Sequence, residues 1–76
     1  REIMTYKPGI LFRVMKKTYA FERMNTTAFQ DEIACIIEAD LIGIVLYIEG
    51  LCLRVMINNK IVFMRYENLV DKCKKI

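Results

Sequence analysis

Residues 41–65 read LIGIVLYIEGLCLRVMINNKIVFMR, a nearly unbroken series of aliphatic, β-branched and aromatic residues, types that are enriched in strands. Two short polar interruptions, Glu49-Gly50 and Asn58-Asn59, divide the series. Both suit tight hairpin turns, because Gly and Asn tolerate the positive φ that such turns demand. The stretch therefore predicts three antiparallel strands, over 41–48, 51–57 and 60–65, joined by two hairpins.

On the N-terminal side of this stretch, Lys-Pro-Gly at 7–9 is a turn signal, and the β-branched and aromatic run at 10–15 predicts a first strand. Phe12 and Val14 share one face of that strand. Residues 16–39 form a long connection without clear periodicity. A structured loop or irregular hairpin is the preferred interpretation, and a short helix over Ala28 to Glu38, capped by Thr27, is the alternative.

On the C-terminal side, residues 66–69 lack strand character and suit one turn of 3₁₀ helix. Residues 70–73 predict a short closing strand, and the basic tail at 74–76 is expected to fray. The fold class predicted is all-β: one small five-stranded barrel domain over residues 1–76, with a long first loop and a 3₁₀ turn before the last strand.

This order of elements resembles an SH3-like small β-barrel. The residues that carry the resemblance are Ala39-Asp40-Leu41-Ile42-Gly43-Ile44-Val45-Leu46, Asn58-Asn59-Lys60 and Glu67-Asn68-Leu69-Val70. The same residues, led by the run at 7–14, also resemble small uncharacterised barrel proteins of tailed phages. The peptide-binding tryptophan of true SH3 domains is replaced by Leu51 and Cys52, and Arg65 and Tyr66 stand near the position of their proline. The resemblance therefore does not imply recognition of proline-rich peptides.

Composition favours a binding protein. Of the 76 residues, 55% are apolar, more than one tiny core needs. We expect the surplus to form a protein interface, with a homodimer or a docked protein as the occupant; the alternative is the ordinary apolar content of any folded surface. Charged residues interrupt every apolar run before it reaches membrane-spanning length, so no membrane association is expected. The expected location is the cytoplasm, or the host cytoplasm if the protein is viral.

The residues that most catalysis requires are missing from the sequence. It contains no histidine, and its three glycines do not cluster into a phosphate-binding loop. Cys35, Cys52 and Cys73 lack paired zinc-ligand spacing and are expected to be reduced, buried small hydrophobic residues. The alternative is an intermolecular disulfide or a reactive thiol, with Cys73 as the first candidate because lysines flank it. We expect no enzyme activity, no cofactor, no metal and no small-molecule substrate.

Alternation along the central strands predicts the binding surface. If Ile44, Leu46, Leu53 and Val55 face inward, then Val45, Tyr47, Arg54 and Met56 face outward. With two residues of the next strand, the predicted partner-binding residues are Tyr47, Arg54, Met56, Phe63 and Arg65, a mixture typical of protein interfaces. The alternative is a bulge, for example at Gly43, that inverts one strand's faces.

A nucleic-acid-binding barrel is the second functional hypothesis. The C-terminal half, residues 41–76, holds six basic and three acidic side chains, and the whole chain has a net charge of +3. The candidate nucleic-acid-binding residues are Arg54, Lys60, Arg65, Lys72, Lys74 and Lys75, with Tyr47, Phe63 and Tyr66 as stacking platforms. A purely structural role as a self-associating subunit is the third hypothesis.

Overall fold

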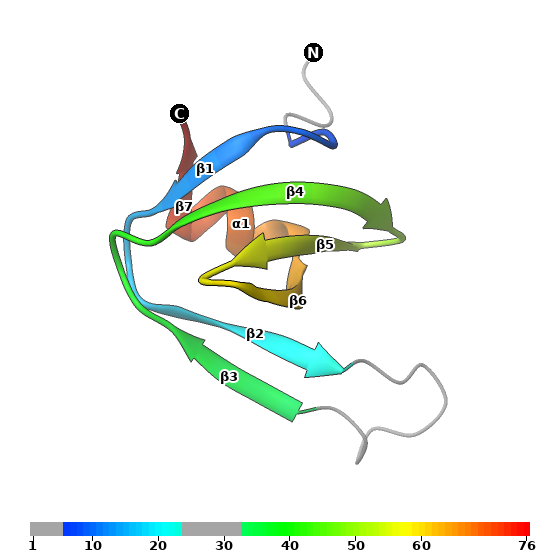
Figure 1. Cartoon of the computed structure of the whole chain (residues 1–76), viewed down its shortest axis with the longest axis horizontal. Helices are drawn as coiled ribbons and strands as arrows, with labels where there is room; N and C mark the ends of the chain where they lie inside the picture. The colour runs from blue at the N-terminus through cyan, green and yellow to red at the C-terminus, as the bar shows by residue number, and fades with distance from the viewer. Residues whose placement is uncertain (1–5, 24–32) are drawn as a thin grey trace.

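The computed structural model describes residues 6–23 and 33–76, which form seven strands and one helix (Figure 1). The elements are β1 (Leu11–Val14), β2 (Thr18–Arg23), β3 (Ile33–Ile37), β4 (Ile42–Glu49), β5 (Cys52–Ile57), β6 (Lys60–Arg65), α1 (Tyr66–Lys72) and β7 (Cys73–Lys75). The chain is mostly β, as predicted. Over the described residues the strand count is seven, not five.

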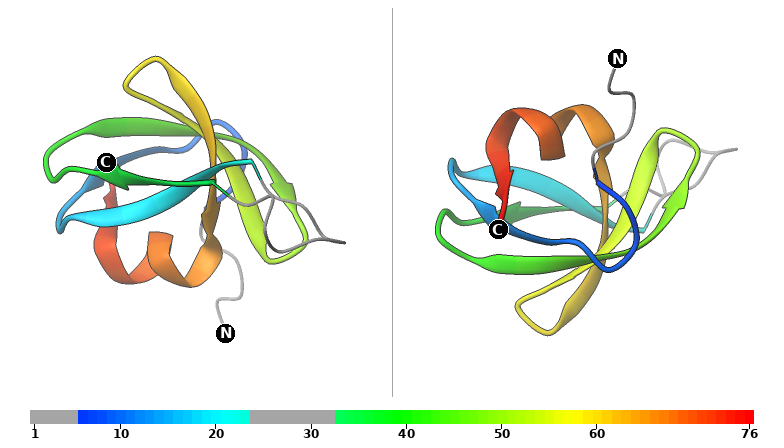
Figure 2. Two further views of the ribbon diagram at one scale, coloured as in Figure 1. Left: turned by 90° about the horizontal axis from the view of Figure 1, so that it is seen from below. Right: turned by 90° about the horizontal axis from the view of Figure 1, so that it is seen from above.

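All seven strands belong to one antiparallel sheet with the order β3-β2-β6-β5-β4-β1-β7. The sheet curls into a half-barrel (Figure 2). Its edges are β3 and the three-residue β7. The predicted central meander is confirmed: β4, β5 and β6 are consecutive neighbours. Asn58 and Asn59 have φ values of 53° and 64°, so the second hairpin turn uses two left-handed residues as expected.

The long connection contains a hairpin. β2 pairs antiparallel with β3, with a register shift between Phe21 and Arg23, which confirms the irregular hairpin for the part that is described. The alternative helix is wrong at its C-terminal end, where residues 33–37 form β3; its residues 28–32 lie outside the described residues. Ile36 and Ile37 explain why these residues form a strand rather than a helix, since β-branched residues suit an extended pairing.

The C-terminal elements differ from the prediction. Residues 66–72 form a two-turn α-helix in place of a 3₁₀ turn, and the closing strand is β7 rather than 70–73. The helix brings Leu69 completely into the core, and the Tyr66 amide donates to the Leu51 carbonyl at 2.9 Å. The tail does not fray at 74–75, because Lys74 and Lys75 pair with β1.

The core lies on the concave side of the sheet, where α1 covers it (Figure 1). Inward-facing strand residues build it, together with Leu69 of α1 and Tyr6, which precedes β1. Its members are Tyr6, Phe12, Val14, Ala20, Ile37, Val45, Leu53, Val55, Ile57, Val62, Met64, Leu69 and Cys73. The opposite face of the same strands therefore points away from the core, and we call it the outer face.

Gly43 sets how closely β1 can approach β4. Phe12 and Gly43 are cross-strand partners, and the Phe12 ring occupies the space that a side chain at Gly43 would need. A Cβ there would lie 2.6 Å from Phe12 Cζ and 3.0 Å from the Met56 carbonyl oxygen. One of these neighbours is backbone, which cannot rotate away. The absent side chain thus allows a fully buried phenylalanine to pack directly on the sheet.

We predict that Gly43→Ala lowers the free energy of unfolding by about 1–3 kcal/mol, because the added methyl group overpacks the space under Phe12. Urea denaturation followed by circular dichroism measures the change. In a Phe12→Leu background the smaller side chain should reduce the penalty of Gly43→Ala. Equal penalties in both backgrounds would show that the ring does not cause the effect.

Candidate protein-binding surface

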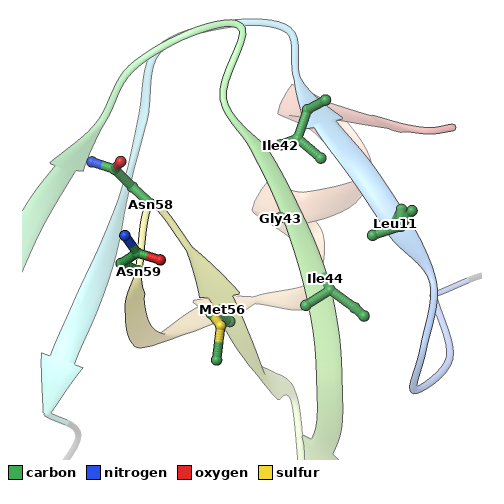
Figure 3. A pocket seen from close by; sticks show the side chains of 7 residues that line it. All are labelled: Leu11, Ile42, Gly43, Ile44, Met56, Asn58 and Asn59. Atoms are coloured by element: carbon green, nitrogen blue, oxygen red, sulfur yellow. The ribbon is translucent and has the colours of Figure 1, made fainter.

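An apolar row crosses four neighbouring strands on the outer face. Leu11 pairs with Ile44, Ile44 with Met56, and Met56 with Ile61, so one residue each from β1, β4, β5 and β6 stands in line. Leu11 is 47% exposed, Met56 39% and Ile61 49%. Figure 3 shows the first three side chains on adjacent strands. We call these four residues the apolar row; as cross-strand neighbours they form a continuous exposed patch.

A surface cavity of about 330 Å³ lies along this row (Figure 3). Its lining is apolar on the strands and polar at the β5–β6 turn. The lining residues are Leu11, Ile42, Gly43, Ile44, Met56, Asn58 and Asn59. A smaller cavity of about 180 Å³, lined by Leu51, Arg65, Tyr66 and Glu67, lies at the other end of β5 and β6. The outer face is thus hollowed at both ends of the central strands.

A second row, which we call the aromatic row, consists of Tyr47, Arg54, Phe63 and Phe21. Register places Tyr47 opposite Arg54, Arg54 opposite Phe63, and Phe63 opposite Phe21, across β4, β5, β6 and β2. Arg54 is followed two residues later on β5 by Met56 of the apolar row, and side chains two apart share a face. The two rows therefore form one surface.

Arginine side chains lie over the rings of the aromatic row. The Arg54 guanidinium carbon is 4.4 Å from the centroid of Phe63 and 5.4 Å from that of Tyr47. Arg65 lies over Phe21 at 5.7 Å, and Phe21 meets Tyr19 edge to face at 5.8 Å. The three arginine–ring distances lie in the cation–π range, and each such contact is worth about 0.5–2 kcal/mol. The stacking holds the long Arg54 side chain against the sheet.

The predicted partner-binding residues come together, although the predicted faces of β4 are partly wrong. Val45 is buried and Ile44 faces outward, the reverse of the expectation. The reason is a register shift between Val45 and Tyr47, a bulge that lies nearer the middle of β4 than the Gly43 position suggested. Tyr47 consequently faces outward as predicted.

The surface includes residues that the sequence interpretation missed. These are Leu11, Ile42, Ile44, Ile61 and Phe21. Alternation around buried Phe12 could have identified Leu11 as outward-facing. Phe21 could not be placed, because its pairing with Phe63 joins β2 to β6 across a long stretch of chain.

The basic residues of the nucleic-acid hypothesis do not share one surface. Only Arg54 and Arg65 lie on the outer face beside the rings. Lys60 forms an ion pair with Glu22 at 2.9 Å, and that hydrogen bond raises the pKa of the lysine. Lys72 lies 3.6 Å from Asp71. Lys74 and Lys75 are on β7, separated from β5 by β4 and β1.

Other kinds of site are limited by what the described residues contain. Within residues 6–23 and 33–76, no group of three or more histidine, cysteine, aspartate or glutamate side chains could hold a metal ion. In the same part of the chain, no helix is long and apolar enough to cross a membrane.

Comparison with protein-family models, with curated proteins and with solved structures gave no match to this chain.

Cys73 is a buried core residue, as expected, rather than the reactive thiol that its lysine neighbours suggested as the alternative. It is only 8% exposed within the core, and burial raises its pKa from 9.0 to about 11. The thiolate is the reactive form of cysteine. At neutral pH Cys73 is therefore a protonated core residue, which contradicts the alternative of a reactive thiol there.

The raised pKa of Cys73 predicts a pH dependence of stability. Because the folded-state pKa lies above the unfolded value, the stabilising contribution is complete below pH 9 and is lost as the pH rises through 11. The stabilities of the wild type and of Cys73→Ala, measured by thermal unfolding, should therefore converge over this range. A constant difference between the two proteins from pH 8 to 11 would contradict the buried thiol.

Proposed function

We propose that this protein is a non-enzymatic protein-interaction module whose outer face docks on a partner protein. The observation that supports it most strongly is the joining of the apolar row and the aromatic row into one exposed surface across β4, β5 and β6. Exposed aliphatic, aromatic, Met and Arg side chains at the centre of a patch are the combination enriched in protein interfaces. Exposed apolar surface of this kind is typically a site of interaction.

Charge and chemistry favour a partner protein over a nucleic acid. The rings of Phe63, Tyr47 and Phe21 already carry guanidinium groups over their faces. Bases would have to displace those groups in order to stack on the same faces. The lysines that would contact phosphates lie elsewhere, and two of them have carboxylate neighbours. The apolar row offers nothing to a phosphate backbone but suits aliphatic side chains of a protein.

The resemblance noted above suggests the biological context. We propose a small phage accessory protein with an SH3-like barrel fold, acting in the host cytoplasm by binding and modulating a host or viral protein. Such a role requires no catalytic chemistry, since a small protein can act by covering a functional surface of its target. Self-association through the same face is the competing outcome that the test below detects.

The proposal predicts that binding depends on Met56. We expect a specific protein from a nuclease-treated bacterial lysate to be retained by the immobilised wild type and lost with Met56→Lys, because a charge at the centre of the apolar row must be desolvated on docking. Val70→Lys is the matched control, since Val70 is an exposed apolar residue on α1, 51% accessible and away from the outer face.

Quantitative mass spectrometry measures retention, and circular dichroism verifies folding of each variant. Equal retention by Met56→Lys and wild type would contradict docking on the outer face. Material that is retained from an untreated lysate but lost after nuclease treatment would also contradict it. Capture of a second copy of this chain alone, with sedimentation showing a wild-type oligomer that Met56→Lys dissociates, would assign the face to self-association instead.

A further inference from the structure

Arg54 occupies the centre of the outer face in an arrangement that packing alone does not explain. Its guanidinium lies over Phe63 and Tyr47, and its Nε is buried with no hydrogen-bond partner. A buried donor of a charged group that lacks an acceptor is destabilising. Methionine or leucine would fill the same space between the rings without burying a charge. An arginine at position 54 is therefore better explained by contact with a partner than by packing within the folded chain.

The charge of Arg54 is not neutralised within the described part of the chain. The two ion pairs found there, Lys60–Glu22 and Lys72–Asp71, involve neither Arg54 nor Arg65. Arg65 is the diagonal neighbour of Arg54 across β5 and β6, about 7–8 Å away between Cα atoms. Two guanidinium groups thus stand on one face among apolar side chains. The complement to such a surface is a negatively charged group surrounded by apolar ones.

The geometry of the Arg54 guanidinium indicates which negatively charged group of a partner it would bind. Contact with the rings of Phe63 and Tyr47 holds the Arg54 guanidinium against the sheet. Its terminal nitrogens form a planar fork that matches a carboxylate with two parallel hydrogen bonds. Met56 follows two residues later, about 7 Å along β5. A partner segment can therefore place a carboxylate on Arg54 and an aliphatic side chain on the apolar row at the same time.

We propose that Arg54 is the specificity-determining residue of the outer face and that it selects partner segments in which an aspartate or glutamate lies beside apolar residues. The terminal guanidinium nitrogens donate hydrogen bonds to the carboxylate, while the neighbouring apolar residues pack on the apolar row. Tyr47 and Phe63 act as positioning residues that hold the guanidinium. This inference rests on the proposed function and adds the chemical class of the partner.

A random-peptide display selection on the immobilised protein tests the proposal directly. We expect the enriched peptides to contain an acidic residue next to aliphatic or aromatic residues. A synthetic peptide of the enriched sequence is then titrated against the wild type and variants by fluorescence anisotropy. Arg54→Met should weaken binding about 10- to 100-fold, the loss produced by removing a hydrogen bond to a charged group.

Two further variants separate geometry from general attraction. Arg54→Lys keeps the charge but lacks the planar fork, so it should also weaken binding. Lys17→Met removes an exposed positive charge in the connection before β2, outside the apolar row and the aromatic row, and should leave affinity unchanged. Replacing the acidic residue of the peptide by its amide should weaken binding to the wild type, yet have little effect on Arg54→Met. Spectra of each variant confirm that the fold is intact.

The possible failures are distinguishable. If enriched peptides require Met56 but carry no acidic residue, or bind Arg54→Met or Arg54→Lys with full affinity, the carboxylate proposal is overturned and the docking face stands. If no peptide that depends on Met56 is recovered, both proposals fail. A fluorescent single-stranded oligonucleotide that binds with a steep salt dependence and requires Arg54 would overturn the choice of a protein partner.

Discussion

The register shift in β4 is the constraint on which the outer surface depends. Side chains of a strand alternate between faces, so an unshifted β4 that buried Val45 would also turn Tyr47 toward the core. The extra residue between these positions lets Val45 pack inward against Val55 while Tyr47 stands outward beside Arg54. One irregularity thereby brings the apolar row and the aromatic row onto a single face.

The curled sheet and the outer face serve different purposes. Packing of Phe12 on Gly43, and of Leu69 from α1 on the concave side, gives this short chain a continuous core. The core uses only one face of the central strands. Their other face carries large apolar side chains that contribute little to the core and stay accessible, such as Ile61 and Met56. Part of the surplus of apolar residues noted in the sequence is located there, and part is exposed elsewhere, for example at Val70 and Ile76.

Local patterns predicted the elements whose contacts are local. The asparagine pair at 58–59 and the alternation of Leu53, Arg54 and Val55 led to the correct hairpin and faces, because neighbouring strands and turn chemistry determine them. What could not be predicted depends on distant contacts. The bulge in β4 lies in the pairing of β4 with β5, just beyond the residues that pair with β1. The helix at 66–72 depends on a deep site for Leu69, and β2 joins β6 through the contact of Phe21 with Phe63. Short periodic signals contain no information about such pairings.

The Arg54 guanidinium, held against the rings of Phe63 and Tyr47, links the fold to the proposed function. Nuclear magnetic resonance of the free protein tests this arrangement most directly. Our account predicts that the δ-methylene protons of Arg54 are shifted upfield by ring currents and show nuclear Overhauser contacts to both Tyr47 and Phe63. It also predicts a visible Nε–H signal, because that group is shielded from solvent. Random-coil shifts for Arg54, with no contact to Phe63, would contradict the account.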